Sequence, residues 1–278
     1  MAGAKRLEAR FAALKAEGRA GFVAYVMAGD PDAETALDIV KALPAAGADV
    51  IELGFPFSDP MAEGPPIQRS AQRALAAGMT LNRVFDTVRR FRETDQATPI
   101  VMMGYMNLVM THGLDAFAAD AARTGVDGLI VVDCPPEEAE PLADALDATG
   151  VALIRLATPT SDDARLAVIA RRTAGFVYYV SVAGVTGVKA VDATSVGPAV
   201  ERVRRATGLP VAVGFGIRTP EQAAAVAEVA DAVVVGSALV DEIAAGLAAN
   251  ENVTSRVLAT ARRLAQAVRA VGPARVQA

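Results

Sequence analysis

The chain has very little of the residues on which much enzyme chemistry depends. Its 278 residues include one cysteine, Cys134, one histidine, His112, and no tryptophan. A lone cysteine excludes an internal disulfide framework and fits a reducing compartment, so we expect a cytoplasmic location. These two residues cannot form the usual zinc ligand sets, and no base stands beside Cys134 in the sequence to activate a catalytic thiol. We therefore expect no metal in this chain.

Long apolar runs and an excess of positive charge are also missing. No apolar run reaches the roughly 18 residues that cross a membrane, and residues 1–21 lack the apolar core of a signal peptide. The formal net charge is -5 and no basic stripe occurs. We expect neither nucleic acid nor a membrane as a partner. Hydrophobic residues make up 53%, enough for a large core, and we expect one domain over residues 1–278.

The sequence does contain a repeated pattern of apolar strands followed by helices. Continuous apolar runs such as 129–132 and 233–235 are typical of strands covered on both faces of a parallel sheet. The predicted strands are 21–27, 49–53, 99–103, 128–132, 152–156, 175–180, 210–213 and 231–235. This spacing favours an α/β fold, a single (β/α)8 TIM barrel, with extra helices at about 4–16 and about 253–271. A doubly wound open sheet is the alternative, since strands are easily miscounted from sequence.

The most informative stretch is the second predicted strand and the loop after it. Glu52 stands in an otherwise apolar run, where a carboxylate is costly unless it is paired or used in chemistry. The stiff loop that follows, rich in glycine and proline, carries two more acids, Asp59 and Glu63. An acid at a strand end with a second acid in an ordered loop is what acid–base catalysis in a barrel needs. The alternative for Glu52 is a structural ion pair with an arginine.

Glycine-rich loops follow the last three predicted strands. Gly214 and Gly216 flank one residue after strand seven, and Gly236-Ser237 stands at the start of a helix after strand eight. Backbone N–H groups and a helix N-terminus bind phosphate at this place in many barrels, although both loops could be simple tight turns. The loop 181–188, with Thr186 near its tip, suits a closing lid or an ordinary glycine turn.

Several other catalytic motifs are absent. The Gly214-x-Gly216 pair lacks the third glycine of a dinucleotide fingerprint, no P-loop occurs, and no lysine lies on a predicted strand to form a Schiff base. Apolar and aromatic residues near the strand ends indicate a substrate with a flat apolar part, although each alone could be ordinary core. These residues are Phe22, Met103, Tyr105, Tyr178 and Phe215.

The order of these motifs closely resembles one family, the tryptophan synthase alpha subunits. The resemblance spans about residues 21–243 and is carried by 51–54, 56–60 and 63–65, then by 29–31, 105–107, Asp133, 184–187, 214–216 and 236–238. It implies retro-aldol cleavage of indole-3-glycerol phosphate to indole and glyceraldehyde 3-phosphate. It also implies an alpha2beta2 assembly in which the beta subunit carries pyridoxal phosphate and receives the indole, so this chain needs no cofactor.

The resemblance also implies roles for individual residues. Glu52 resembles the general acid–base group, and Glu63 stands where the family usually has an aspartate that meets the indole N–H. The implied indole pocket consists of Phe22, Met103, Tyr105, Tyr178 and Phe215. The implied phosphate site and lid consist of Gly187, Gly216, Gly236, Ser237 and Thr186. The implied contact with the beta subunit involves Asp59, Pro60, Asn107 and Leu108.

Three alternative functions stay open from the sequence. A barrel phosphosugar isomerase or epimerase would share the phosphate loops and a glutamate base, but it would not explain the aromatic residues. A stand-alone indole-3-glycerol phosphate lyase would share the whole site and release free indole. A regulatory subunit without activity would not need Glu52 and Thr186, so their presence argues against it.

Overall fold

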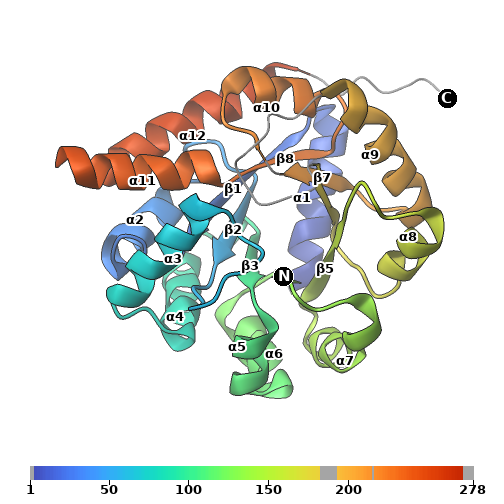
Figure 1. The fold of residues 1–278 in the computed structure, drawn as a ribbon, viewed down its shortest axis with the longest axis horizontal. Helices are drawn as coiled ribbons and strands as arrows, with labels where there is room; N and C mark the ends of the chain where they lie inside the picture. The colour runs from blue at the N-terminus through green and yellow to red at the C-terminus, as the bar shows by residue number, and fades with distance from the viewer. Residues whose placement is uncertain (1–2, 182–192, 215, 272–278) are drawn as a thin grey trace.

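The computed structural model describes residues 3–181, 193–214 and 216–271, and within these ranges the strands form one closed barrel. Each strand is parallel to its neighbours, in the order β1 to β8, and β1 pairs with β8 (Figure 1). The strands are β1 (Gly21–Met27), β2 (Val50–Gly54), β3 (Ile100–Gly104), β4 (Gly128–Val131), β5 (Ala152–Ala157), β6 (Val177–Val180), β7 (Val211–Gly214) and β8 (Ala232–Val235). The predicted (β/α)8 barrel is confirmed. The alternative of an open sheet is wrong, because β1 pairs with β8 and leaves no unpaired edge strand.

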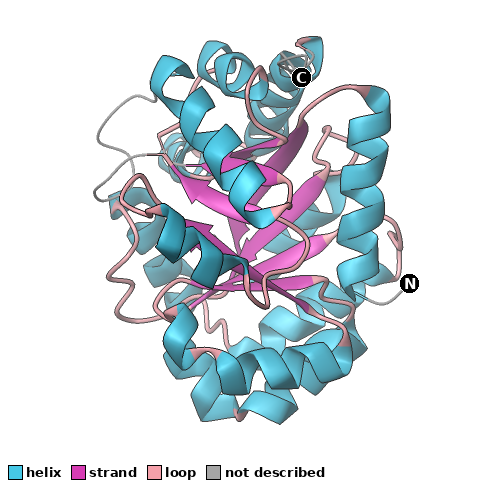
Figure 2. Ribbon diagram, turned by 90° about the vertical axis from the view of Figure 1, so that its right-hand side faces the viewer, coloured by secondary structure: helices cyan, strands magenta, loops and turns pink. Residues whose placement is uncertain are grey.

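Helices surround the barrel, and α1 (Gly3–Glu17) lies across one end of it, next to the N-terminus in Figure 2. Leu7 and Leu14 of α1 are buried beneath the strands and close that end. The other helices are α2 (Ala33–Ala42), α3 (Pro65–Ala76), α4 (Leu81–Arg92), α5 (Met106–His112), α6 (Leu114–Thr124), α7 (Glu140–Thr149), α8 (Asp163–Ala170), α9 (Ala193–Thr207), α10 (Pro220–Ala227), α11 (Ser237–Ala249) and α12 (Val253–Ala270), with a 3-10 turn, η1 (Pro136–Glu138). In the described ranges, no helix is long and apolar enough to cross a membrane.

Three aspartates organise the N-terminal end of the barrel. Asp49, Asp127 and Asp231 each stand directly before a strand, and each carboxylate accepts a hydrogen bond from a backbone N–H of the preceding strand, at 2.9, 2.7 and 2.8 Å. Arginines neutralise them: Arg10 and Arg19 pair with Asp49, Arg6 and Arg92 with Asp127, and Arg204 with Asp231. These contacts fix the strand ends, so β2 and β8 begin one residue later than the sequence predicts.

Two glycines clear space inside the barrel for tyrosines. Side chains alternate between the barrel interior and the helix layer along each strand. An added Cβ at Gly54 would overlap the hydroxyl of Tyr25, and one at Gly214 would overlap the hydroxyl of Tyr178. Both tyrosine rings can therefore lie near the C-terminal end of the barrel only because these two positions lack a side chain.

Candidate active site

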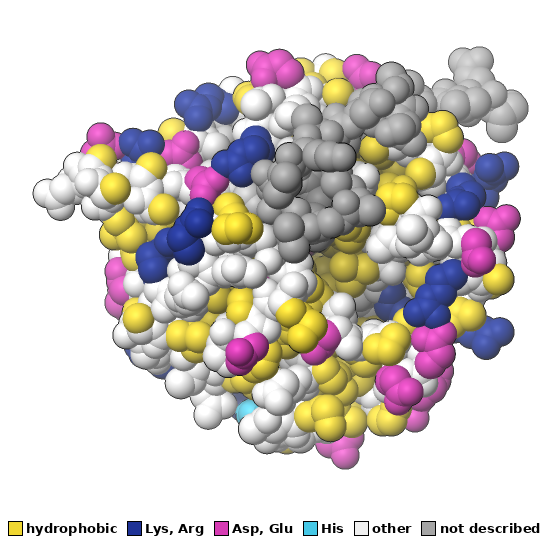
Figure 3. All heavy atoms as spheres, in the orientation of Figure 1, with side chains coloured by type: hydrophobic (Ala, Val, Ile, Leu, Met, Phe, Trp, Pro, Cys, Tyr) yellow, Lys and Arg dark blue, Asp and Glu magenta, His cyan; other side chains and the backbone are white. Residues whose placement is uncertain are grey.

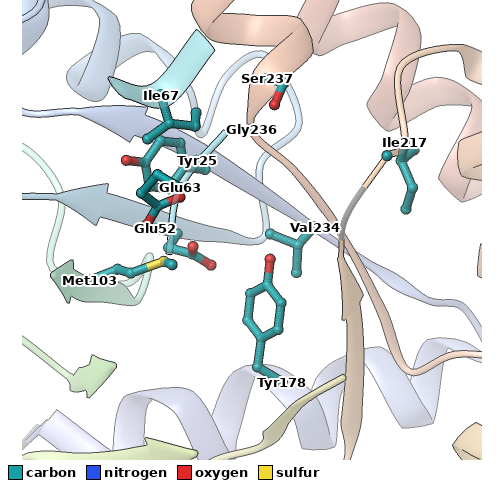
Figure 4. A pocket seen from close by; sticks show the side chains of 11 residues that line it. Tyr25, Glu52, Glu63, Ile67, Met103, Tyr178, Ile217, Val234, Gly236 and Ser237 are labelled. Atoms are coloured by element: carbon teal, nitrogen blue, oxygen red, sulfur yellow. The ribbon is translucent and has the colours of Figure 1, made fainter. Parts of the chain in front are cut away.

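A cavity lies at the C-terminal ends of the barrel strands (Figure 4). Its lining residues are Tyr25, Glu52, Glu63, Ile67, Met103, Tyr178, Gly216, Ile217, Val234, Gly236 and Ser237. They come from strands β1, β2, β3, β6 and β8, from the loops after β2 and β7, and from the N-terminal residues of α3 and α11. The barrel thus gathers in one place side chains that are up to about two hundred residues apart in the sequence, as is usual for this fold.

Glu52 enters the cavity from the middle of β2, where Tyr25 of β1 and Val101 of β3 are its register partners. The residue is only 1% exposed, and its Oε2 atom is buried without a hydrogen-bond partner. Burial raises the pKa of this carboxyl to about 8, and the nearby charge of Glu63 adds to the shift. No described residue forms an ion pair with Glu52, so the structural alternative of an arginine partner is not supported.

Glu63 reaches the cavity from the loop between β2 and α3. The loop is held in place on both sides, since the Ala62 N–H donates to the Tyr105 hydroxyl at 3.0 Å and the Gln68 side chain donates to the Glu63 carbonyl at 2.9 Å. Phe57 packs against the Tyr105 ring, with centroids 5.2 Å apart. Glu63 is 7% exposed, and burial raises the pKa of its carboxyl to about 7.

The charge of the cavity is unusual because no cation among its described lining residues offsets the two glutamates. Among the described lining residues there is no lysine, arginine or histidine. Figure 4 shows the Glu52 carboxylate between Glu63 and the Tyr178 hydroxyl. Burial is the main cause that raises the pKa of the Tyr178 phenol, and the charges of Glu52 and Glu63 add to the shift. Carboxyl groups whose pKa values lie near neutral pH can both give and take protons, which is the requirement for acid–base catalysis.

The opposite wall of the cavity is suited to an anion. Gly236 follows the last residue of β8, and α11 begins at Ser237 with no side chain capping its first turn. The N–H groups of an uncapped first turn lie at the positive end of the helix dipole and can bind a phosphate without a lysine. Gly216, whose φ is +78°, brings a second stretch of backbone to the same cavity.

Not every residue predicted for the indole pocket lines the cavity. Phe22 is fully buried but does not line it, and Tyr25, three positions further along β1, takes that place. Residues three apart on a strand point to opposite faces, so only one of them can face the barrel interior. Tyr105 lies beside the cavity and holds the Glu63 loop. Three predicted residues lie outside the described residues: Thr186, Gly187 and Phe215.

Sequence comparison agrees with this geometry. Residues 11–269 match the model of a family described as the tryptophan synthase alpha chain. The chain belongs to this family. Over 264 residues it is 73% identical to the tryptophan synthase alpha chain of Phenylobacterium zucineum (strain HLK1), covering 95% of each chain. It is 71% identical to that of Caulobacter vibrioides (strain NA1000 / CB15N), covering 95% of this chain and 96% of the relative.

Solved structures show the same fold. The tryptophan synthase alpha subunit of Legionella pneumophila str. Paris superimposes with a TM-score of 0.90 at 39% identity, covering 98% of this chain and 100% of that one. A chain of Mycobacterium tuberculosis tryptophan synthase superimposes with a TM-score of 0.86 at 36% identity, covering 95% and 98%. The resemblance to the tryptophan synthase alpha subunits is therefore confirmed along nearly the whole chain.

The remaining predicted residues of this alpha chain lie on the surface. Asp59 and Asn107 are exposed, and Pro60 and Leu108 are half-buried.

Lys and Arg side chains are scattered over the face seen in Figure 3 and do not form one stripe. The described residues hold no cluster of histidine, cysteine or acidic side chains that could bind a metal. The Nε2 atom of His112 is hydrogen-bonded to Oδ2 of Asp120 at 2.9 Å, and His112 does not line the cavity, in line with a structural role.

Proposed function

We propose that this chain catalyses the alpha reaction of tryptophan synthase, the retro-aldol cleavage of indole-3-glycerol phosphate to indole and glyceraldehyde 3-phosphate. The observation that carries the proposal is a cavity with two buried, uncompensated carboxyl groups at one wall and an uncapped helix N-terminus at another. A substrate with an indole at one end and a phosphate at the other matches these two walls. Met103, Tyr178 and Ile67 supply apolar surface for the ring.

Glu52 is the proposed acid and base of the reaction. With a pKa of about 8 the carboxyl is protonated at neutral pH and can donate its proton to C3 of the indole. The protonated ring then accepts the electron pair of the breaking C–C bond. The carboxylate left behind takes the proton of the glycerol hydroxyl that becomes the aldehyde, so Glu52 returns to its starting state.

Glu63 is the proposed partner of the indole N–H. A carboxylate there stabilises the positive charge that develops on the ring when C3 is protonated. Gly216, Gly236 and Ser237 are proposed to bind the phosphate through backbone N–H groups. Gly187 and Phe215 are proposed to complete the phosphate and indole sites, and Thr186 to act as the lid residue.

A beta chain is the proposed partner, in an alpha2beta2 assembly that passes indole to pyridoxal phosphate bound on the beta chain. The description of the family as the alpha chain of tryptophan synthase supports a second kind of chain as partner. We propose Asp59, Pro60, Asn107 and Leu108 as part of the contact face, because all four are accessible, the first two on the loop after β2 and the last two on α5. A cytoplasmic location is part of the same proposal, since the substrate is a phosphorylated metabolite.

The direct test is to follow indole release from indole-3-glycerol phosphate by the purified chain, alone and with a beta chain added. We expect slow release alone and a strong rise with the partner. Glu52→Gln should bind the substrate and lose about 10²–10⁴-fold in turnover, as removal of a proton-transfer group does. Fast release without a partner would favour the stand-alone lyase. Turnover of sugar phosphates without indole release would favour the isomerase or epimerase.

A further inference from the structure

The hydroxyl of Tyr25 is a polar group inside the cavity that the proposed chemistry does not use. Tyr25 lies on β1 as the register partner of Glu52 on β2, and its side chain lines the cavity. The residue is only 5% exposed. Its hydroxyl approaches β2 at Gly54, where the absence of a Cβ leaves the space it occupies. The fold thus accommodates a phenol, and not merely an aromatic ring, beside the two glutamates.

This hydroxyl makes no hydrogen bond with any residue that the structure describes. The Tyr105 hydroxyl, by contrast, accepts the backbone N–H of Ala62 at 3.0 Å. Tyr25 lines the cavity, and an O–H donor that substrate cuts off from water costs free energy unless it finds an acceptor. The structure therefore calls for an acceptor that engages Tyr25 when the site is filled.

The acidic and phenolic groups around Tyr25 narrow the choice of acceptor. Burial is the largest cause that raises the pKa of Tyr25, and four neighbouring groups add to it, in decreasing order Glu63, Glu52, Tyr105 and Asp30. Asp30 is already held by two hydrogen bonds of 2.7 Å from Arg73 and by Ser70, and Tyr105 holds the loop after β2. Of these four described groups the two glutamates remain, and Glu63 adds more than Glu52 to the raised pKa of Tyr25.

Glu63 is also the carboxylate that needs an orienting contact. It extends from a loop on a side chain with three rotatable bonds, and no hydrogen bond joins its carboxylate to another described residue. Glu52, in contrast, projects from the middle of a strand in the barrel wall. The Tyr25 hydroxyl is a donor and the Glu63 carboxylate an acceptor, neither has a hydrogen bond to a described residue, and both residues line one cavity, so the two can pair.

We propose that Tyr25 is a positioning residue whose hydroxyl donates a hydrogen bond to the Glu63 carboxylate in the substrate-bound site. This rests on the proposed function, because the bond matters through the indole N–H that Glu63 is to meet. By fixing one carboxylate oxygen, Tyr25 directs the other toward the ring. The Tyr25 hydroxyl thereby fixes the position of the Glu63 carboxylate, whose side chain is longer than the aspartate usual in the family, relative to the substrate.

The test is a double-mutant cycle between Tyr25→Phe and Glu63→Gln, read as indole release. Tyr25→Phe keeps the ring and should lower kcat/KM about tenfold, the size expected for a hydrogen bond to a charged group, with most of the loss in kcat. In the Glu63→Gln background the same change should have less than about a twofold effect. Tyr179→Phe is the matched control, because Tyr179 is buried on β6 but does not line the cavity, and it should leave kcat/KM unchanged.

A second measurement separates the two proposals. Indolepropanol phosphate lacks the hydroxyl that becomes the aldehyde, so it cannot undergo the retro-aldol step. It is bound to the wild type and to Tyr25→Phe, and the Glu63 carboxyl is titrated by carbon-13 NMR. Loss of the donor should raise the pKa of Glu63, since a hydrogen bond stabilises the charged form. Unchanged titration, full activity of Tyr25→Phe, or equal losses in both backgrounds would overturn the role of Tyr25. A wild type that neither cleaves the substrate nor binds the analogue would refute the proposed function itself.

Discussion

Replacing Glu52 by glutamine should stabilise the protein, and increasingly so as the pH rises. The pKa of Glu52 is raised from 4.5 to about 8 by burial and by the charge of Glu63. Between these values the unfolded chain has lost the proton while the folded chain retains it. The folded state then binds more protons, so its stability falls with rising pH through this window. Glutamine has nearly the same shape and no proton to lose, so this penalty disappears.

The size of the effect follows from the shift in pKa. A difference of about 3.5 units between the folded and unfolded states, at about 1.36 kcal/mol per unit, amounts to about 5 kcal/mol above pH 8. Little of this is present near pH 4.5. We therefore expect the advantage of Glu52→Gln over the wild type to grow by about 4 kcal/mol between pH 5 and pH 9.

Urea unfolding at pH 5, 7 and 9 measures this directly, provided the m-values of the two proteins agree. Glu8→Gln, a change at an exposed glutamate of α1, is the control and should stay within about 0.5 kcal/mol at every pH. A stability difference for Glu52→Gln that stays constant from pH 5 to pH 9 would show that Glu52 ionises like a surface carboxyl. The proposed proton donor at neutral pH would then be lost as well.

Three further predictions concern other parts of the chain. Glu63→Asp should give equal or higher kcat for indole release, and a large loss would mean that the loop has adapted to the longer side chain. Asp127→Asn leaves two buried arginines uncompensated and should lower the unfolding free energy by about 3–5 kcal/mol in urea, against less than about 0.5 for Asp86→Asn at an exposed pair. Ser237→Asp should raise KM at least about tenfold by repelling phosphate at the start of α11, with the circular dichroism unchanged; an unaltered KM would place the phosphate elsewhere.

The fold could be predicted from the sequence because the strands are continuous apolar runs separated by helices. The errors lie at the ends of strands. β6 begins at Val177 and not at Gly175, since Gly175 has a φ of +78° and leaves the extended conformation. β3 and β7 begin after Pro99 and Pro210, which have no N–H to donate to a neighbouring strand. Apolar content predicts a strand, but backbone hydrogen bonding sets its first residue.

Site residues could be predicted from the sequence where the residue type is unusual for its position in a strand or loop. They could not be predicted where the residue type is the ordinary one. Glu52 stands out as an acid in an apolar run, and the glycines of the phosphate loops stand out at strand ends. Tyr25 does not stand out, because an aromatic residue in a buried strand is the ordinary case. A side chain at Gly21 would face Leu14 inside the barrel. Because side chains on a strand alternate between its two faces, the side chain of Tyr25 points to the same face as position 21, and that of Phe22 points to the other.

Burial alone cannot tell which of two neighbouring acids takes part in the chemistry. Asp49 and Glu52 are three residues apart in one buried segment, and both are almost completely buried. Arg19 makes two hydrogen bonds of 2.9 Å to Asp49, whereas Glu52 has no cation among the described residues. The ion-pair alternative raised for Glu52 is thus true of Asp49. The carboxylate of Asp49, paired with an arginine, holds the structure, whereas burial without a cation raises the pKa of Glu52 toward the range where a carboxyl can exchange protons. The distinction depends on Arg19, which the turn between α1 and β1 brings to one end of the barrel, so it appears only when the chain is folded.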